Sequence, residues 1–141
     1  MRISARNQLQ GTVTNIAEGA VNGVVTIDLG SASVKAVITM EAIEALGLRE
    51  GMNAFAIIKA SSVMFAAGSE AIKGLSARNQ LAGTVASVKK GAVNGHVSLR
   101  LSDGAAIMGS VTNEAIEELG LTEGAEALAI VKSTDVMVGV E

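Results

Sequence analysis

One polar hexapeptide occurs twice in this chain without a single change. Residues 4–9 read Ser-Ala-Arg-Asn-Gln-Leu, and residues 76–81 read the same. The segments 19–23 and 91–95 also match each other, at the same spacing of 72 residues. The chain therefore contains two copies of one module, and a duplicated polar motif indicates a duplicated site.

The spacing between matching residues grows from 72 to 73 within the module. Residues 39–48 match residues 112–121 at the larger spacing, so one residue is inserted upstream of them. The turn at 30–31, which corresponds to 102–104, is the expected place. A hairpin tip absorbs an insertion there without disturbing the register of its strands.

Two units are too few for a solenoid, so we expect tandem small domains. The first module covers residues 1–68, a linker covers 69–74, and the second module covers 75–141. Modules of this size lie near the lower limit for a self-sufficient core. Because 49% of the residues are hydrophobic and there is no cysteine, we expect the surplus apolar surface to be covered in a homo-oligomer.

Hydrophobic alternation predicts a meander of strands in each module, followed by one short helix and two further strands. In the first module these are strands at 11–16, 21–29 and 34–38, a helix at 40–46, and strands at 53–59 and 63–65. Thr39 precedes the helix as a hydroxyl cap and Gly47 follows it. We therefore predict an all-β fold with one short helix per module: two tandem OB-like five-stranded Greek-key barrels.

Composition excludes several classes of function. With no cysteine and only one histidine, thiolate chemistry, disulfides and His/Cys metal sites are ruled out. A net charge of −3 with two Phe and no Trp or Tyr disfavours a nucleic-acid binder of the OB type. No acid and base pair recurs at a repeated site, so we expect no enzyme. Without an apolar signal or membrane-spanning run, the expected location is the cytoplasm.

Three polar segments of each module remain as candidates for binding. They are Ser4-Ala5-Arg6-Asn7, the turn that includes Val21 and Asn22, Lys59-Ala60-Ser61, and their counterparts Ser76-Ala77-Arg78-Asn79, Val93 with Asn94, and Lys132-Ser133-Thr134. These segments supply hydrogen-bond donors and contain no Asp or Glu. Such a set suits a fully ionised oxyanion, which accepts hydrogen bonds at every oxygen.

Structural explanations exist for each of these residues taken alone. Arg6 and Lys59 are also typical of solvated strand ends, and Asn22 beside glycine is typical of a turn. His96 stands where the first copy has Val24. A unique residue cannot serve a duplicated site, so we interpret it as a surface or interface residue.

The motifs together resemble the molbindin (Mop) family of small molybdate- and tungstate-binding proteins. The resemblance rests on the Ile-Ser-Ala-Arg-Asn-Gln-Leu opening, the Gly-Ala-Val-Asn-Gly turn, the Glu-Ala-Ile-Glu helix and the Lys-Ser-Thr-Asp ending. It covers nearly the whole chain, once per module. It implies Mop or TOBE-type barrels, six modules per particle and hence a trimer of this chain, with oxyanion sites at subunit interfaces and no organic cofactor.

The resemblance also implies which residues bind the anion. The opening and strand-end segments are the main contributors, and the turn residues Val21, Asn22, Val93 and Asn94 are weaker candidates. The function implied is storage or homeostasis of molybdate and tungstate. The alternative is a molybdate sensor that acts through a separate transporter or regulator.

The two copies differ at one candidate position. Ala60 stands in the first copy where the second has Ser133. A lost hydrogen bond to a charged group is worth about 1.5–3 kcal/mol. If this hydroxyl binds the anion, the first site is expected to bind more weakly unless Ser61 compensates.

Overall fold

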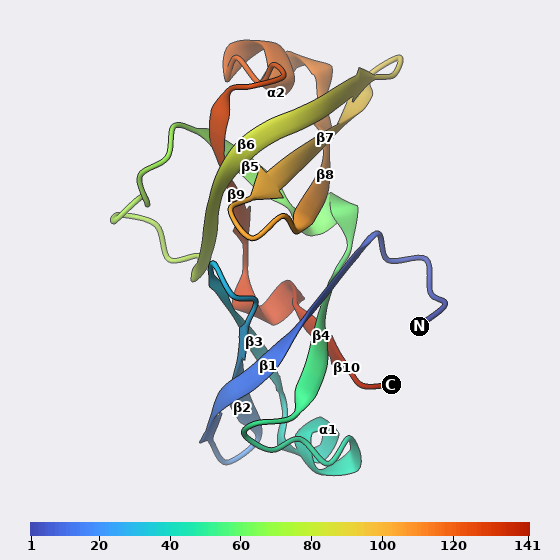
Figure 1. Cartoon of the computed structure of the whole chain (residues 1–141), viewed down its shortest axis with the longest axis vertical. Helices are drawn as coiled ribbons and strands as arrows, with labels where there is room; N and C mark the ends of the chain where they lie inside the picture. Colours follow the sequence, from blue (N-terminus) through green and yellow to red (C-terminus); the bar gives the residue numbers. More distant parts are fainter.

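The computed structural model describes all 141 residues and contains two five-stranded antiparallel sheets, one per lobe (Figure 1). Each sheet curls around its own part of the core, and the short helices lie at opposite ends of the molecule. The elements of the first repeat are β1 (Asn7–Glu18), β2 (Asn22–Asp28), β3 (Ser33–Thr39), α1 (Met40–Ala45), β4 (Asn53–Ile58), η1 (Ala60–Ser62) and β5 (Met64–Ala67). Those of the second are β6 (Asn79–Lys90), β7 (Asn94–Leu101), β8 (Ala106–Thr112), α2 (Asn113–Glu118), β9 (Glu126–Val131), η2 (Ser133–Asp135) and β10 (Met137–Gly139).

The predicted fold class is confirmed, including the helix and its cap. The Oγ1 atom of Thr39 accepts a hydrogen bond from the backbone N–H of Ala42 at 3.0 Å. Gly47 ends the helix with a φ of 62°, a conformation that favours glycine. Neither helix is long and apolar enough to cross a membrane.

The inserted residue lies in the hairpin between β7 and β8, as the sequence predicts. The shorter hairpin closes with a bond from the N–H of Leu29 to the carbonyl of Ala32, and the longer one from Leu101 to Ala105. The extra length carries Asp103, whose pKa is lowered by the backbone N–H of Ala105 and by Ser31 of the first repeat. The two hairpin tips therefore meet.

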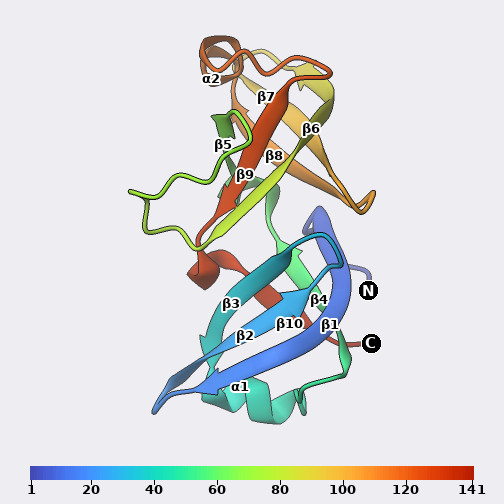
Figure 2. The same ribbon diagram turned by 60° about the vertical axis from the view of Figure 1, so that its left-hand side comes forward.

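The last strand of each repeat belongs to the sheet of the other repeat. β5 pairs with β9, with Met64 opposite Ile130, and β10 pairs with β4, with Met137 opposite Ile57. The sequence places residues 63–65 in the first module and the linker at 69–74, but it does not say which sheet the last strand of a module joins. In the structure, the chain crosses between the lobes before β5 and again before β10 (Figure 2). The repeat boundaries of the sequence and the boundaries of the sheets thus differ.

The exchanged strands pack against β8 and β3 with side chains of complementary size. Phe65 of β5 lies against Gly109, where an added Cβ atom would come within 2.4 Å of the ring. The corresponding residues of the other lobe are Val138 of β10 and the fully buried Ala36 of β3. A large side chain faces glycine in one lobe, and a smaller one is matched with alanine in the other. Both lobes contribute to one continuous cluster of 25 buried hydrophobic residues.

Candidate anion-binding clefts

The two main candidate segments of the first repeat meet in one cleft, which we call the first cleft. Antiparallel pairing of β1 with β4 puts Asn7 opposite Ile58, so the start of one strand lies beside the end of the other. The cleft has a volume of about 510 Å³. Its lining consists of Ser4, Ala5, Arg6, Lys59, Ala60 and Ser61, together with Ile3, Ser110 and Met137.

The second cleft is built in the same way from the second repeat. β6 and β9 place Asn79 opposite Val131, and the cleft has a volume of about 320 Å³. It is lined by Ser76, Ala77, Lys132, Ser133 and Thr134, with Leu75 and Met64. Because of the strand exchange, Met64 and Met137 each reach the cleft of the other repeat. Each cleft thus contains side chains from both repeats.

The buried asparagine of each hexapeptide bonds to the opposite lobe and not into a cleft. Asn7 donates from Nδ2 to the carbonyl of Met108 and accepts from the N–H of Met108, both at 2.8 Å. Asn79 makes the same two bonds to Lys35, also at 2.8 Å. Both asparagines are almost fully buried. The amide oxygen and one N–H of each side chain are thus used by the opposite lobe, and neither asparagine is among the residues that line the clefts.

The glutamine of each hexapeptide holds the segment in shape. Gln8 donates from Nε2 to the carbonyl of Ala5, and Gln80 donates to that of Ala77, both at 3.3 Å. Gln80 also exchanges two bonds with the backbone of Ile72 and so fixes the connecting segment. The identical hexapeptides therefore combine structural residues with residues that face a cleft.

Other predicted site residues lie away from the clefts. Arg78 is exposed and does not line the second cleft, unlike Arg6 in the first. Val21 and Val93 are about 70% exposed, at hairpin turns in the lobes. Their carbonyls accept hydrogen bonds from the first residues of α1 and α2. Asn22 and Asn94 begin β2 and β7 and are also exposed.

Ser110 lines the first cleft, and the sequence reasoning missed it. It comes from β8 of the second repeat, which packs against η1. The matching residue of the first repeat is Val37. The first cleft thus lacks the hydroxyl of Ser133 at Ala60 but gains one from Ser110. The difference between Ser110 and Val37 on equivalent strands is the sequence signal that could have identified this residue.

The charges of both clefts favour anions. Arg6 and Lys59 border the first cleft and Lys132 borders the second, and no Asp or Glu lines either. No group of three or more His, Asp or Glu side chains is arranged to hold a metal ion. Hydroxyl and cationic donors without a carboxylate form a suitable environment for a dianion.

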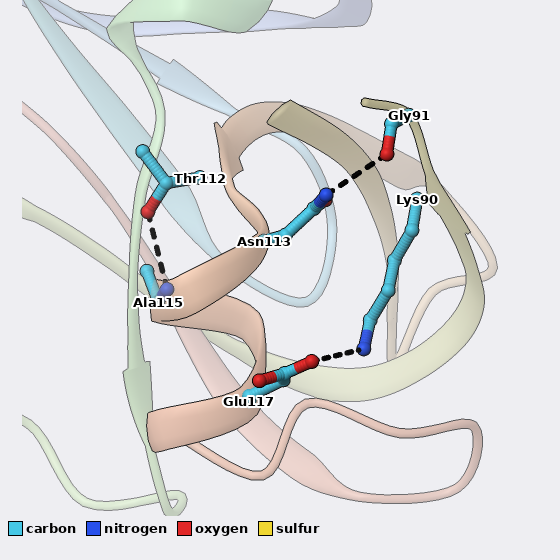
Figure 3. A network of polar contacts seen from close by, with 6 residues as sticks. All are labelled: Lys90, Gly91, Thr112, Asn113, Ala115 and Glu117. Carbon is cyan, nitrogen blue, oxygen red and sulfur yellow. Dashed lines mark hydrogen bonds and ion pairs between the residues drawn. The ribbon is translucent and has the colours of Figure 1, made fainter. Parts of the chain in front are cut away.

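A further cleft beside α2 has a different character. Its volume is about 400 Å³, and Lys90, Glu117 and Glu123 are among its lining residues. Lys90 and Glu117 form an ion pair at 3.0 Å, and Asn113 donates to the carbonyl of Gly91 at 2.9 Å (Figure 3). The lysine charge is thus already balanced, and the second carboxylate repels a dianion. We do not assign the oxyanion to this cleft.

Comparison with known families identifies the fold. The model of the TOBE domain matches twice, over residues 3–65 and 75–138. The chain belongs to the TOBE-domain family, with two domains in tandem. A crystal structure of the cytoplasmic molybdate-binding protein ModG with molybdate bound superposes with a TM-score of 0.94 at 45% identity, and each chain is fully covered.

Relatives in sequence agree with the predicted Mop resemblance, which is confirmed. The molybdenum transport protein ModE of Herbaspirillum seropedicae is 42% identical over all of this chain. The molybdenum-pterin-binding protein MopA of Rhodobacter capsulatus is 41% identical over 97% of it. The chain spans about half the length of both relatives, 52% in each case. The molybdenum-pterin-binding protein 2 of Clostridium pasteurianum matches 45% of this chain over 94% of its own length, at 50% identity.

Proposed function

We propose that this chain binds molybdate reversibly in the first and second clefts, without chemical transformation of the anion. The supporting observation is that each cleft joins the opening segment of a repeat to its lysine-containing strand end and has no carboxylate in its lining. Similarity to ModG, which was crystallised with molybdate bound, supports the identity of the anion.

The donor set gives the proposed selectivity a physical basis. Hydroxyl groups and ammonium or guanidinium groups stabilise the charge of an oxyanion. Phosphate retains a proton near neutral pH and is best held where a strong acceptor is present, which these clefts lack. Sulfate is smaller than molybdate, so donors spaced for the larger anion reach it poorly. Tungstate has the size and charge of molybdate and is expected to bind in the same clefts.

We propose storage or buffering in the cytoplasm as the biological role, in an assembly of three chains. If each cleft faces a neighbouring chain in this assembly, bound molybdate stabilises the assembly as its concentration rises. The exposed turns at Val21 and Val93 are then available for contacts between chains. The similarity to ModE, which covers all of this chain and 52% of ModE, favours a second candidate role, in which the same modules serve molybdenum transport through a further partner.

Isothermal titration with molybdate, tungstate, sulfate and phosphate tests this proposal. We expect molybdate and tungstate to bind at least tenfold more tightly than sulfate. Lys59→Ala and Lys132→Ala should each weaken one class of sites by about tenfold or more, because each removes a charged donor. Lys73→Ala, which removes an exposed lysine outside both clefts, is the control. Equal affinity for molybdate and sulfate would contradict the proposal, and native mass spectrometry measures the number of chains.

A further inference from the structure

A row of three polar residues crosses the second lobe. Lys89 on β6 lies directly opposite His96 on β7, and His96 lies directly opposite Ser110 on β8. Residues directly opposite each other in a sheet point to the same face. Lys89 and His96 are exposed, and Ser110 is half-buried. Two basic side chains and one hydroxyl therefore form a continuous row, which we call the basic row.

The first lobe has an apolar row at the same place. Ala17 lies opposite Val24, and Val24 lies opposite Val37, in the register of the basic row. All three positions therefore change from apolar to polar between the repeats. The shared fold does not require the polar residues, because the first lobe forms the same strands without them.

The basic row connects the first cleft to a neighbouring cleft. Ser110 lines the first cleft, whereas Lys89 and His96 line a cleft of about 460 Å³ together with Met108. Arg6 lines both clefts, so the two are contiguous. The row crosses two strand spacings, or about 10 Å. This span exceeds what a single tetrahedral oxyanion needs.

The cationic residues of the neighbouring cleft, Arg6 and Lys89, form no ion pair. No Asp or Glu lines the cleft, and neither ion pair of the molecule involves Arg6, Lys89 or His96. Arg6 and Lys89 carry the positive charge of this cleft, and the imidazole ring of His96 adds a hydrogen-bonding group. An anion bound between them receives charge-assisted hydrogen bonds from the guanidinium and the ammonium groups.

We propose that Arg6, Lys89, His96 and Ser110 form a binding site for a diphosphate group, which adjoins the first cleft and shares Arg6 and Ser110 with it. Two linked phosphate groups match a row that has Lys89 and His96 at one end, Ser110 at the other, and Arg6 beside it. The diphosphate is either inorganic pyrophosphate or part of a nucleoside diphosphate. The site exists once per chain, because repeat one has the apolar row.

Titration of the full chain with pyrophosphate, ADP and inorganic phosphate tests the site. We expect pyrophosphate or ADP to bind at least tenfold more tightly than phosphate, and the tighter of the two identifies the source of the diphosphate. The variant K89A/H96V carries the residues of the first repeat, which that lobe tolerates, and should lose at least tenfold in diphosphate affinity. K73A is the matched control and should bind as the wild type does.

Three outcomes would overturn this inference: no diphosphate binding by the wild type, unchanged binding by K89A/H96V, or an equal loss in K73A, which would indicate a general charge effect. Thermal melting verifies that the double variant is folded, and K89A alone, at an exposed position, provides a second test. Molybdate titration of the same samples keeps the two proposals apart. Failure to bind molybdate would contradict the proposed function and leave the diphosphate site standing.

Discussion

The two clefts have the same backbone frame but differ in the origin of one hydroxyl group. In the second cleft, Ser133 and Thr134 come from the repeat that also supplies the opening segment. In the first cleft, Ala60 has no hydroxyl, and Ser110 arrives from the other repeat. The contact of β8 with η1 thus puts a hydroxyl group of the second repeat into a cleft where the first repeat has lost one. Each cleft therefore depends on the sequence of both repeats.

The two asparagine contacts are the most symmetric feature of the molecule and should have the largest effect when removed. Asn7→Ala and Asn79→Ala each remove two hydrogen bonds and leave strand groups of the opposite lobe unpaired. We expect each to lower the free energy of unfolding by about 2–4 kcal/mol, measured by urea denaturation. Asn53→Ala, at an exposed position, is the control. A large difference between the two losses would show that the lobes are not equivalent here.

The match of Phe65 with Gly109 should give the next largest effect. Gly109→Ala places a methyl group against the ring, and overpacking of this kind costs about 1–3 kcal/mol of unfolding free energy. Adding Phe65→Val should recover most of the loss, because the pair then repeats the Val138 and Ala36 combination of the other lobe. Denaturation of the single and double variants measures this. A harmless Gly109→Ala would contradict the close contact.

The hydroxyl groups of the first cleft should affect affinity more than stability. Ser110→Val, which introduces the residue of the first repeat, should weaken molybdate binding there by about tenfold. Ala60→Ser in the same protein should restore affinity by supplying the hydroxyl of Ser133. Titration in a Lys132→Ala background isolates the first cleft. Val37→Ala, in the equivalent strand, provides the control, and an unchanged affinity in Ser110→Val would show that Ser110 only borders the cleft.

The smallest effect concerns the surface charges beside the helices. The second repeat pairs Lys90 with Glu117, whereas the matching residues of the first are Glu18 and Glu44. Glu18→Lys should create the missing pair and stabilise the protein by about 0.2–1 kcal/mol. Lys90→Glu should destabilise it by a similar amount. Urea denaturation measures the unfolding free energy of each variant relative to the wild type. Both differences should become smaller in high salt, and differences that do not change with salt would argue against an ion pair.

Local patterns were sufficient to predict the elements of the fold. Alternating apolar residues indicate the strands, and the Thr39 cap with Gly47 indicates the helix. These signals can be recognised without knowing which strands pair. The inserted residue at the hairpin tip was also predictable, because insertion elsewhere would shift a strand register. These features are determined by residues that are close together in the sequence.

The exchange of β5 and β10 depends on a choice that local sequence does not contain. β4 and β9 present equivalent edges, so a last strand with the same alternation fits either one. The sizes of Phe65 and Gly109 favour one pairing over the other, and their contact becomes visible once the strands are paired. The sequence therefore predicts how many strands form but not which lobe each completes.

The candidate sites were predictable as clusters and less so as individual contacts. The opening and strand-end segments meet in the clefts because antiparallel pairing brings strand starts beside strand ends. Asn7 and Asn79 share the polar character of their neighbours, yet their side chains bond to the opposite lobe. Burial distinguishes the residues that bond to the opposite lobe from those that line a cleft. The sequence of a hexapeptide does not reveal which of its residues are buried. Whether the clefts bind molybdate stays a prediction for titration.

The crossing of β5 and β10 also changes what counts as a unit of this protein. A cut in the segment 68–74 would yield two fragments, and each would hold the strand that finishes the sheet of the other. The fragments would stay associated as complementary halves, and neither would be a complete barrel. A single-repeat ancestor with this topology would have been an intertwined dimer, and gene fusion would have turned its two chains into one.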